Sequence, residues 1–303
     1  MKKILPAIFF ALTLLTASAA EPPRLSFDRP SKPGAYFNAE ISLTAVREYT
    51  IALPGPDKPV ERRESLNATL FADIKVLEVN ETGAPLRLEI RISSCGGFLN
   101  GHRFNSELLN RKTVLADLRG KKTRFTDSAT GAELEPSAAA LLSAVFRPAS
   151  DGSLKDTLGA SAPLTPGYKW KISARPVLDS LHARGLKVEP LSLKAEAVIA
   201  GTEKFRGIET CRVKVELSSS DTDAVDFRFQ TTIWVPLDPA LNVIRTSRNG
   251  VEVVDTVLPG DNPLASGSTL RVVTQEVLEA VVVPAEEKTA EPKKRSWSDF
   301  ILR

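Results

Sequence analysis

Two cysteines and two histidines are the residues of this chain best suited to chemistry at a thiolate or a metal. Cys95 and Cys211 are the only cysteines among 303 residues. In an oxidising compartment an even cysteine count favours a disulfide. A bond between them would close a long loop and stabilise the fold by about 4–5 kcal/mol on the chain-entropy model. The alternative is two separate buried thiols.

Catalysis or metal binding at these residues would also require His102 or His182, the only histidines. A nucleophilic Cys95 needs a base within hydrogen-bond reach. His102 follows Cys95 by seven residues and His182 precedes Cys211 by 29, which matches no compact zinc motif. The chain also lacks Gly-x-Ser-x-Gly and His-Glu-x-x-His. We therefore predict no catalytic residue, no metal and no cofactor, and keep a hydrolase without a recognisable motif as an alternative.

Residues 1–19 have the pattern of a secretory signal peptide. Lys2 and Lys3 precede a short apolar run, and Ala17-Ser18-Ala19 offers small residues at a cleavage site. A membrane anchor is the competing interpretation, but the run of about 12 residues is shorter than the roughly 20 that a spanning helix needs. We expect a mature protein in the periplasm or outside the cell.

The distribution of charge gives no reason to expect a nucleic-acid partner. The net charge of +3 falls to +1 when Lys2 and Lys3 leave with the signal. The last 16 residues contain five basic and two acidic side chains, so the remaining body is slightly acidic. Nucleic-acid-binding domains instead carry a basic surface on the folded body.

The C-terminal residues 284–303 are predicted to form a flexible linker followed by a basic amphipathic tail. At helical spacing, the aromatic and aliphatic side chains of the tail share one face. This tail is a candidate for docking to a membrane surface or to an envelope protein; packing on its own domain and a frayed terminus are the alternatives. The docking candidates are Lys293, Lys294, Arg295, Trp297, Phe300 and Ile301.

Alternation of apolar and polar residues dominates the body of the chain and predicts half-buried antiparallel strands. A proline-rich leader, 20–38, precedes a β-rich domain at 39–283, with a subdivision or a long connection near 152–167. Helices are expected at 136–147 and 177–184, and Asn249-Gly250 indicates a hairpin turn within 241–257. The predicted strands are 41–45, 66–76, 86–93, 113–118, 123–126, 168–172, 193–200, 208–218, 224–235 and 270–283. The predicted class is mainly β, with a large curved antiparallel sheet, a half-open barrel, and one or two short helices.

Four aromatic residues are candidates for lining a ligand cavity: Trp170, Phe227, Phe229 and Trp234. Phe227 and Phe229 share one face of a predicted strand with Thr231, Ile233 and Val235, because side chains two apart point the same way. Packing in the core is the alternative role for all four.

Two segments resemble exported bacterial half-open β-barrel proteins such as the LolA/LppX-like lipoprotein carriers and uncharacterised secreted families. Leu164 to Trp170 has a Pro-Gly-x-x-Trp opening to a strand, and Phe205 to Cys211 is a glycine turn that leads into a strand. The resemblance covers residues 39–283. It implies a curved sheet closed on its concave side by helices, with an apolar cavity for acyl chains.

These observations predict an exported, non-enzymatic binding or scaffold protein of the bacterial envelope that holds an apolar or lipid ligand on a curved sheet. One alternative is an envelope-assembly component that docks a partner or membrane through the tail. The other is the hydrolase without a recognisable motif.

Overall fold

The structure, a computed structural model, describes residues 22–53, 58–120, 122–146, 154–173, 175, 178–179, 193–221, 225–257 and 268–286. The predicted signal peptide, the predicted helix at 177–184 apart from 178–179, and the predicted linker and tail from residue 287 on lie outside these residues. Within the described part of the chain, no helix is both long and apolar enough to cross a membrane.

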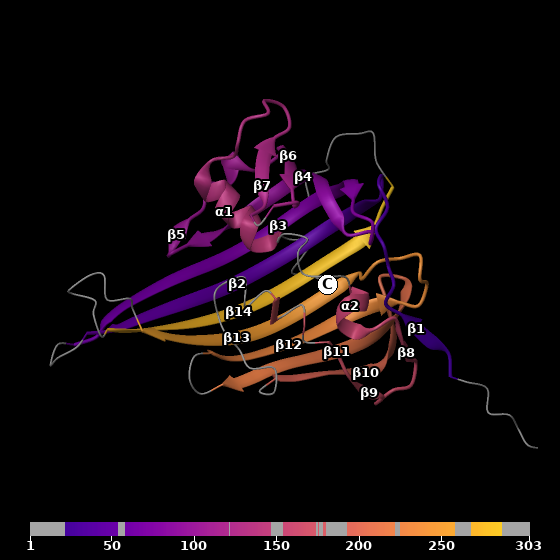
Figure 1. The fold of residues 1–303 in the computed structure, drawn as a ribbon. Helices are drawn as coiled ribbons and strands as arrows, with labels where there is room; N and C mark the ends of the chain where they lie inside the picture. The colour runs from indigo at the N-terminus through magenta and orange to yellow at the C-terminus, as the bar shows by residue number, and fades with distance from the viewer. Residues whose placement is uncertain are drawn as a thin grey trace, which may run out of the picture.

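Strands make up most of the described structure (Figure 1). The early strands are β1 (Arg24–Ser26), β2 (Tyr36–Ala52), β3 (Val60–Val79), β4 (Pro85–Leu99), β5 (His102–Arg103), β6 (Thr113–Asp117) and β7 (Arg124–Asp127). The later strands are β8 (Ser161–Pro163), β9 (Lys169–Lys171), β10 (Leu193–Phe205), β11 (Ile208–Asp221), β12 (Val225–Pro236), β13 (Arg245–Val257) and β14 (Thr269–Pro284). The helices are η1 (Ser106–Leu108), α1 (Pro136–Val145) and α2 (Leu154–Leu158).

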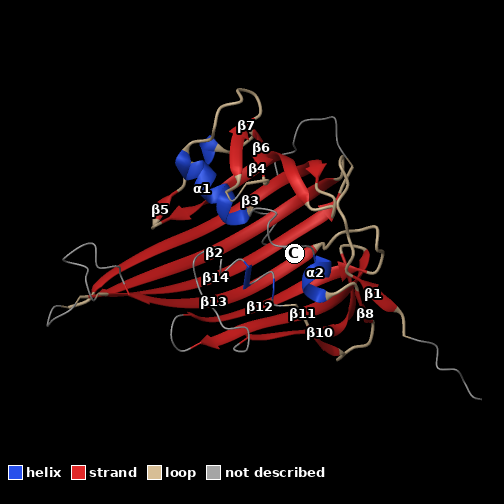
Figure 2. Cartoon of the chain, viewed as in Figure 1, coloured by secondary structure: helices blue, strands red, loops and turns tan. Residues whose placement is uncertain are grey.

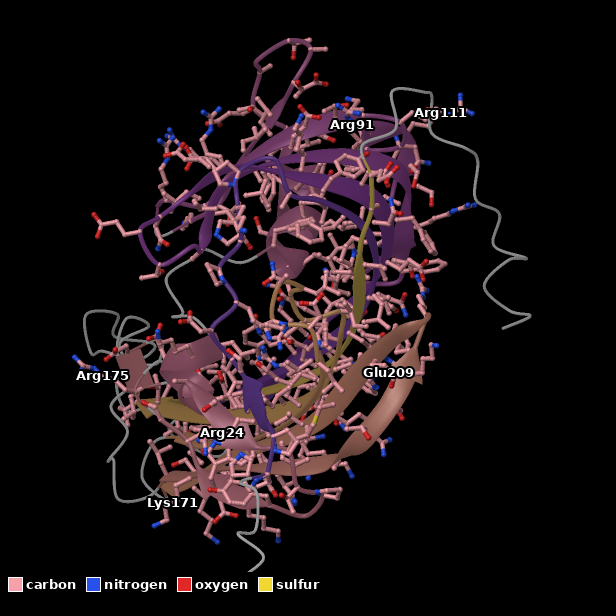
Figure 3. All side chains as sticks on the ribbon, turned by 90° about the vertical axis from the view of Figure 1, so that its right-hand side faces the viewer. Arg24, Arg91, Arg111, Lys171, Arg175 and Glu209 are labelled. Carbon is pink, nitrogen blue, oxygen red and sulfur yellow. The ribbon has the colours of Figure 1, made fainter. Side chains whose placement is uncertain are left out.

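Twelve strands form one antiparallel sheet in the order β7-β6-β4-β3-β2-β14-β13-β12-β11-β10-β9, with β5 paired to β4. The last strand, β14, pairs with β2 and β13 and so joins the two halves of the chain in the middle of the sheet. The sheet is not closed, because β7 and β9 are free of each other at its two ends. Figure 3 shows it bending around the side chains of one face. The predicted class, mainly β with a large antiparallel sheet and few helices, is confirmed.

One face of the sheet, here called the inner face, carries most of the buried side chains. It is defined by Ile41 on β2, Leu70 on β3, Ala280 on β14 and Ile233 on β12, which share one side because antiparallel partners point the same way. The opposite, outer face carries charged side chains such as Arg228, which pairs with Glu216 at 2.9 Å. This separation follows from the period-two pattern of the sequence.

Two large hydrophobic clusters cover the inner face at opposite ends of the sheet. The first combines β2, β3, β4, β6 and β7 with α1, whose Leu141 and Leu142 are buried in it. The second combines β10, β11 and β12 with β1, β8 and α2, including Leu158. Figure 2 shows both helices on the same side of the sheet. Pro136 begins α1, as expected for a proline in the first helical turn.

The proline-rich leader is more ordered than its composition predicts. Arg24–Ser26 form β1, which pairs with β8, and the side chain of Phe27 is fully buried in the second cluster. The segment expected to be a loop at 152–167 supplies the partners, because α2 and β8 both form within it. An apolar pair, Leu25 and Phe27, therefore anchors a segment that prolines keep extended.

The predicted hairpin turn at Asn249-Gly250 is wrong, because both residues lie in the middle of the single strand β13. Gly250 stands directly opposite Phe229 on β12. A Cβ atom at position 250 would lie 2.2 Å from Phe229 Cδ1, so the aromatic ring occupies the space above the glycine. The glycine is needed for side-chain packing across strands rather than for a turn.

Candidate functional site

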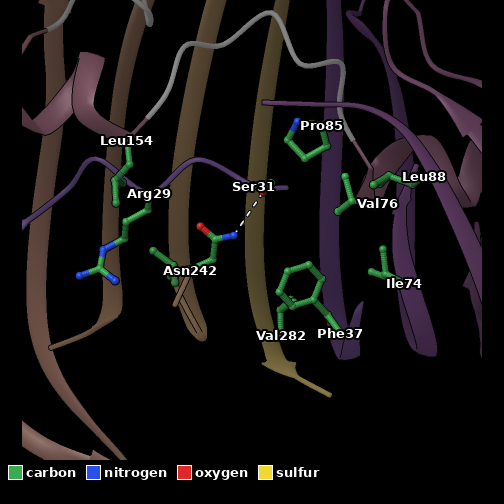
Figure 4. A pocket seen from close by; sticks show the side chains of 11 residues that line it. Arg29, Ser31, Phe37, Ile74, Val76, Pro85, Leu88, Leu154, Asn242 and Val282 are labelled. Atoms are coloured by element: carbon green, nitrogen blue, oxygen red, sulfur yellow. Dashed lines mark hydrogen bonds between the residues drawn. The ribbon is translucent and has the colours of Figure 1, made fainter. Parts of the chain in front are cut away.

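An apolar cavity of about 290 Å³ lies between the leader and the inner face of the sheet (Figure 4). Its walls come from four strands, α2, the leader and the segment that precedes β13. The lining side chains are Arg29, Ser31, Phe37, Ile74, Val76, Pro85, Leu88, Leu154, Asn242, Val243 and Val282.

The sheet side of the cavity is apolar because alternate residues of neighbouring strands face it. Phe37 belongs to β2, and its register partner on β3 is Ile74. Val76 pairs in turn with Leu88 on β4. Val282 is an inner-face residue of β14, opposite Ala39 on β2. All of these positions follow from the same alternation that builds the first cluster.

The leader side of the cavity supplies polar groups. Asn242 Nδ2 donates a hydrogen bond to Ser31 Oγ at 3.2 Å. The Arg29 guanidinium donates to the backbone carbonyl oxygens of Ser26, at 3.0 Å, and Pro236, at 2.6 Å. It also donates to the carbonyl oxygens of Asp238 and Leu241.

Arg29 therefore joins the leader to the β12–β13 connection. Burial lowers the pKa of Arg29 from its ordinary value, while Asp238 acts in the opposite direction. The hydrogen bonds to four carbonyl groups compensate the partly buried charge, so the residue acts as a clamp that holds this side of the cavity in place.

None of the four aromatic residues predicted to line a cavity lines this one. Trp170 stacks on Phe27 with ring centroids 5.9 Å apart and donates from Nε1 to the Leu158 carbonyl at 3.0 Å. Phe227 and Phe229 form a tilted pair, 5.5 Å apart, in a small third cluster on the inner face.

Trp234 is buried on the outer face, where the Arg245 guanidinium lies 4.3 Å from its ring centroid. Its Nε1 donates to the carboxylate of Glu203. Of the four candidates, Trp170, Phe227 and Phe229 therefore pack in clusters of the inner face, and Trp234 belongs to a cation–aromatic contact on the other side of the sheet.

The cysteines are free thiols, both buried, in separate clusters. Cys95 is on β4 and Cys211 is on β11, with five strands between them in the sheet order. A disulfide requires Cα atoms about 4.4–6.8 Å apart, whereas each intervening strand adds roughly 4.8 Å along the sheet. The predicted disulfide is therefore not formed in the structure. Burial raises the pKa of Cys95 to about 12 and that of Cys211 to about 11.

The other sequence candidates do not assemble into a site. His102 is exposed on β5, and His182 is outside the described residues. No grouping of three or more potential metal ligands occurs among the residues that the structure describes. The tail candidates, Lys293 to Ile301, also lie outside them. The docking of the tail stays a prediction.

Comparison with known proteins adds no family. No protein-family model matches the chain, and no curated protein matches it either. Among solved structures, one of lipovitellin ("lipid-protein interactions in lipovitellin") is similar with a TM-score of 0.28 and 10% identity, over 86% of this chain and 27% of that chain. The chain thus spans about a quarter of the length of lipovitellin.

Two further solved structures show weaker similarity. A DUF1329 family protein from Desulfovibrio piger has a TM-score of 0.18 and 11% identity, covering 77% of this chain and 83% of that one. DynF, from the dynemicin biosynthesis pathway of Micromonospora chersina, has a TM-score of 0.15 and 8% identity, with 93% of each chain covered. At these TM-scores the likenesses assign neither a family nor a function.

Proposed function

We propose that the protein is an exported, non-enzymatic binding protein that holds one apolar chain in the cavity beneath its leader. The observation that carries this proposal is the apolar cavity itself. Its sheet side is made by Phe37, Ile74, Val76, Leu88 and Val282, which present only hydrocarbon surface. Pockets lined mainly by apolar side chains with a few placed polar groups are typical of small-molecule binding sites.

The size of the cavity favours a slender ligand. Its volume of about 290 Å³ is at the small end of ligand pockets, which hold roughly 300–1,000 Å³. A single alkyl or acyl chain suits this space, whereas a lipid with several chains exceeds it. Each methylene group that the chain buries contributes about 0.8 kcal/mol to binding.

The expected export of the protein agrees with this role. Residues 1–19 have the pattern of a signal peptide, which would deliver the mature chain to the periplasm or the cell exterior. Single-chain apolar molecules need a carrier or a holder in such an aqueous compartment, because water excludes their hydrocarbon surface. The resemblance to lipoprotein carriers of the cell envelope likewise implies a cavity that takes acyl chains.

Binding of the neutral fluorescent probe N-phenyl-1-naphthylamine tests the proposal. We expect saturable binding with one site per chain and competition by a dodecyl-chain ligand. Val282→Phe fills the cavity and should weaken probe binding at least tenfold, since an aromatic ring then occupies part of the ligand volume.

The matched control is Val283→Phe, which introduces the same side chain at the next position of β14, on the outer face opposite Asn38. We expect this variant to bind the probe like the unmodified protein. The absence of saturable binding to the unmodified protein, or equal weakening by both substitutions, would refute the proposed site.

A further inference from the structure

A strip of polar side chains crosses the middle of the otherwise apolar inner face. Most of its residues belong to the central strands β13 and β14. One residue comes from each neighbouring strand, β2 and β12. Its members are Arg47, Thr231, Thr246, Arg248, Glu252, Thr274 and Glu276, here called the polar strip.

The strand register places these residues on the same side as the cavity. Arg248 pairs with Leu278 on β14 and with Thr231 on β12. Glu252 pairs with Thr274, which is itself opposite Arg47. Directly opposite partners in antiparallel strands share a face, so the strip is continuous across the four strands.

Apolar side chains flank two rows of the polar strip on both sides. Residues that stand directly opposite one another form rows across the sheet. In the row of Arg248, Leu278 and Leu43 lie toward the first cluster, and Val215 lies toward the second. In the row that contains Glu276, the neighbours are Ala45 on one side and Phe229, beyond Gly250, on the other. In these two rows the polar side chains lie between apolar ones. In the row of Glu252 the flanking residues are Phe227 on β12 and, beyond Arg47, Glu64 on β3.

The charges of the strip are balanced and partly withdrawn from water. Arg248 Nη2 lies 3.5 Å from Glu276 Oε1, and their side chains are 26% and 14% exposed. The guanidinium carbon of Arg248 lies 4.9 Å from the centroid of the Phe229 ring. Glu252 is buried, at 8% exposure. The strip thus contains two arginines and two glutamates, and the row of Arg47 continues on β3 to Glu64.

Stability alone does not account for charges at these positions. Replacing a buried ion pair by apolar residues of similar volume is often neutral or stabilising. The positions that flank Arg248 and Glu276 on neighbouring strands, such as Leu43, Ala45 and Val215, are apolar, so a continuous hydrophobic core would be the simpler solution there. A ligand that carries charges of its own provides a reason for the arrangement.

The polar strip lies within reach of a chain held in the cavity. Val282 lines the cavity, and Leu278, the register partner of Arg248, lies four residues earlier on the same strand and face. Four residues of strand span roughly 13 Å. An extended chain that followed β14 from Val282 past Ala280 would reach Arg248 and Glu276 with its polar end.

We propose that the polar strip binds the head group of a single-chain amphiphile, and that this head group is zwitterionic. The anionic group of the ligand faces Arg248, and its cationic group faces Glu276 and Glu252. A head group with both charges matches a strip with two positive and two negative side chains, whereas a purely anionic or cationic one leaves half of the strip opposed to it. This inference rests on the proposed function, because the alkyl chain occupies the same cavity.

Four ligands with a common dodecyl chain separate head-group recognition from chain binding. Dodecylphosphocholine is zwitterionic, dodecyl phosphate anionic, dodecyltrimethylammonium cationic and dodecyl maltoside uncharged. Each is titrated below its micelle concentration against bound N-phenyl-1-naphthylamine. We expect the zwitterion to compete about tenfold more strongly than either singly charged ligand, the gain expected from one additional charge-assisted hydrogen bond.

Substitutions in the strip identify the groups responsible. Arg248→Gln and Glu276→Gln should each lower the affinity for dodecylphosphocholine about tenfold and leave that for dodecyl maltoside unchanged. Arg271→Gln is the matched control, since Arg271 lies on the outer face of β14 and pairs with Asp255 at 3.2 Å. If a single substitution prevents folding, the double variant Arg248→Leu with Glu276→Leu removes both charges together and should show the same loss.

The outcomes distinguish the two proposals. Equal competition by all four ligands, or affinities in the strip variants that match those of the control, overturns the head-group site and leaves the apolar site intact. A protein that never binds the probe overturns the proposed function and the head-group site together.

Discussion

The two hydrophobic clusters of the inner face are completed in different ways. The first draws almost entirely on residues 35–146, with three side chains from β14. The second is assembled from separate segments of the chain and depends on Leu25 and Phe27 from the leader. The first half of the sheet therefore packs with its own segment, whereas the second half is completed by β1 and Phe27 of the leader.

This difference explains where the cavity forms. After Phe27 the leader crosses from the second cluster to the first, where the Ser31 N–H donates to the Gly83 carbonyl at 2.9 Å and the Gly34 N–H donates to the Val76 carbonyl at 2.8 Å. The crossing segment is held at both ends and passes over the sheet between the two clusters. The cavity is the space left beneath it.

The largest expected effect comes from removing the anchor of the leader. Phe27→Ala should lower the free energy of unfolding by about 3–5 kcal/mol, because it leaves a void in the second cluster. It should also abolish probe binding, because the leader forms one side of the cavity. Urea unfolding and titration with N-phenyl-1-naphthylamine measure the two effects.

Leu142→Ala in the first cluster is the corresponding change in the other half of the sheet. Leu142 is fully buried in α1, and we expect a loss of about 2–5 kcal/mol in stability with probe binding retained. Equal effects of the two substitutions on binding would contradict the different roles assigned to the clusters.

A smaller difference in stability is expected between alanine substitutions at two glycines, one in each half of the sheet. Gly250→Ala places a Cβ atom 2.2 Å from the Phe229 ring, and we expect a loss of about 1–3 kcal/mol in the free energy of unfolding. Gly96→Ala on β4 meets no atom within 4 Å and should not destabilise the protein. Thermal or urea unfolding of both variants tests the close approach of β12 and β13.

The loss should be recovered in part when Phe229 is made smaller. In the double variant Gly250→Ala with Phe229→Leu, the two substitutions should be less destabilising together than the sum of their separate effects, because they are in contact. Strictly additive effects would show that the ring does not lie above the glycine.

The two buried thiols make the stability of the protein depend on pH in the alkaline range. The folded-state pKa is about 12 for Cys95 and about 11 for Cys211, both above the ordinary value of 9.0. Each buried neutral thiol therefore stabilises the folded protein fully below pH 9.0, and this contribution is lost as the pH rises toward the folded-state pKa. We expect Cys95→Ala to reduce the alkaline loss of stability more than Cys211→Ala does.

Alkylation by iodoacetamide tests the state of the same cysteines. Both should resist modification in the native protein at pH 8, because the thiolate is the reactive form, and both should react after unfolding without a reductant. Modification that requires a reductant would instead establish the disulfide predicted from the sequence.

The smallest effect is expected at the surface of the first half. Hydrogen bonds from Arg119 hold the pKa of Asp117 at about 2, below its ordinary value of 3.8. The stabilisation is present above pH 3.8 and is lost as the pH falls toward 2. Because the pair is exposed, Asp117→Asn should change the free energy of unfolding by no more than about 0.5 kcal/mol at neutral pH. A larger loss, measured by urea unfolding, would contradict this placement.

The alternation of residues was sufficient to predict most of the sheet. The shared face of Phe227, Phe229 and Ile233 follows directly from spacing, and Pro136 correctly indicates the start of a helix. Asn249-Gly250 led to a wrong turn prediction because glycine occurs both in turns and where a large side chain crosses the backbone. Only the strand register shows that Gly250 accommodates an aromatic ring.

The candidate site was harder to predict, because its two sides are far apart in the sequence. The inner-face positions of Phe37, Ile74 and Val282 are visible in the pattern. The leader that covers them is polar and rich in proline, so its composition gives no sign that Phe27 and Arg29 fix it across the sheet. The aromatic residues that stand out in the sequence pack elsewhere, since large side chains fill clusters more readily than they border a cavity.

Native mass spectrometry of the protein purified from its own host tests the central claim, that the space beneath the leader holds one apolar chain. We predict one bound single-chain amphiphile per protein chain, lost in Val282→Phe and retained in Val283→Phe. An unmodified protein that emerges without a bound molecule and takes up no dodecyl-chain ligand on addition would contradict the claim.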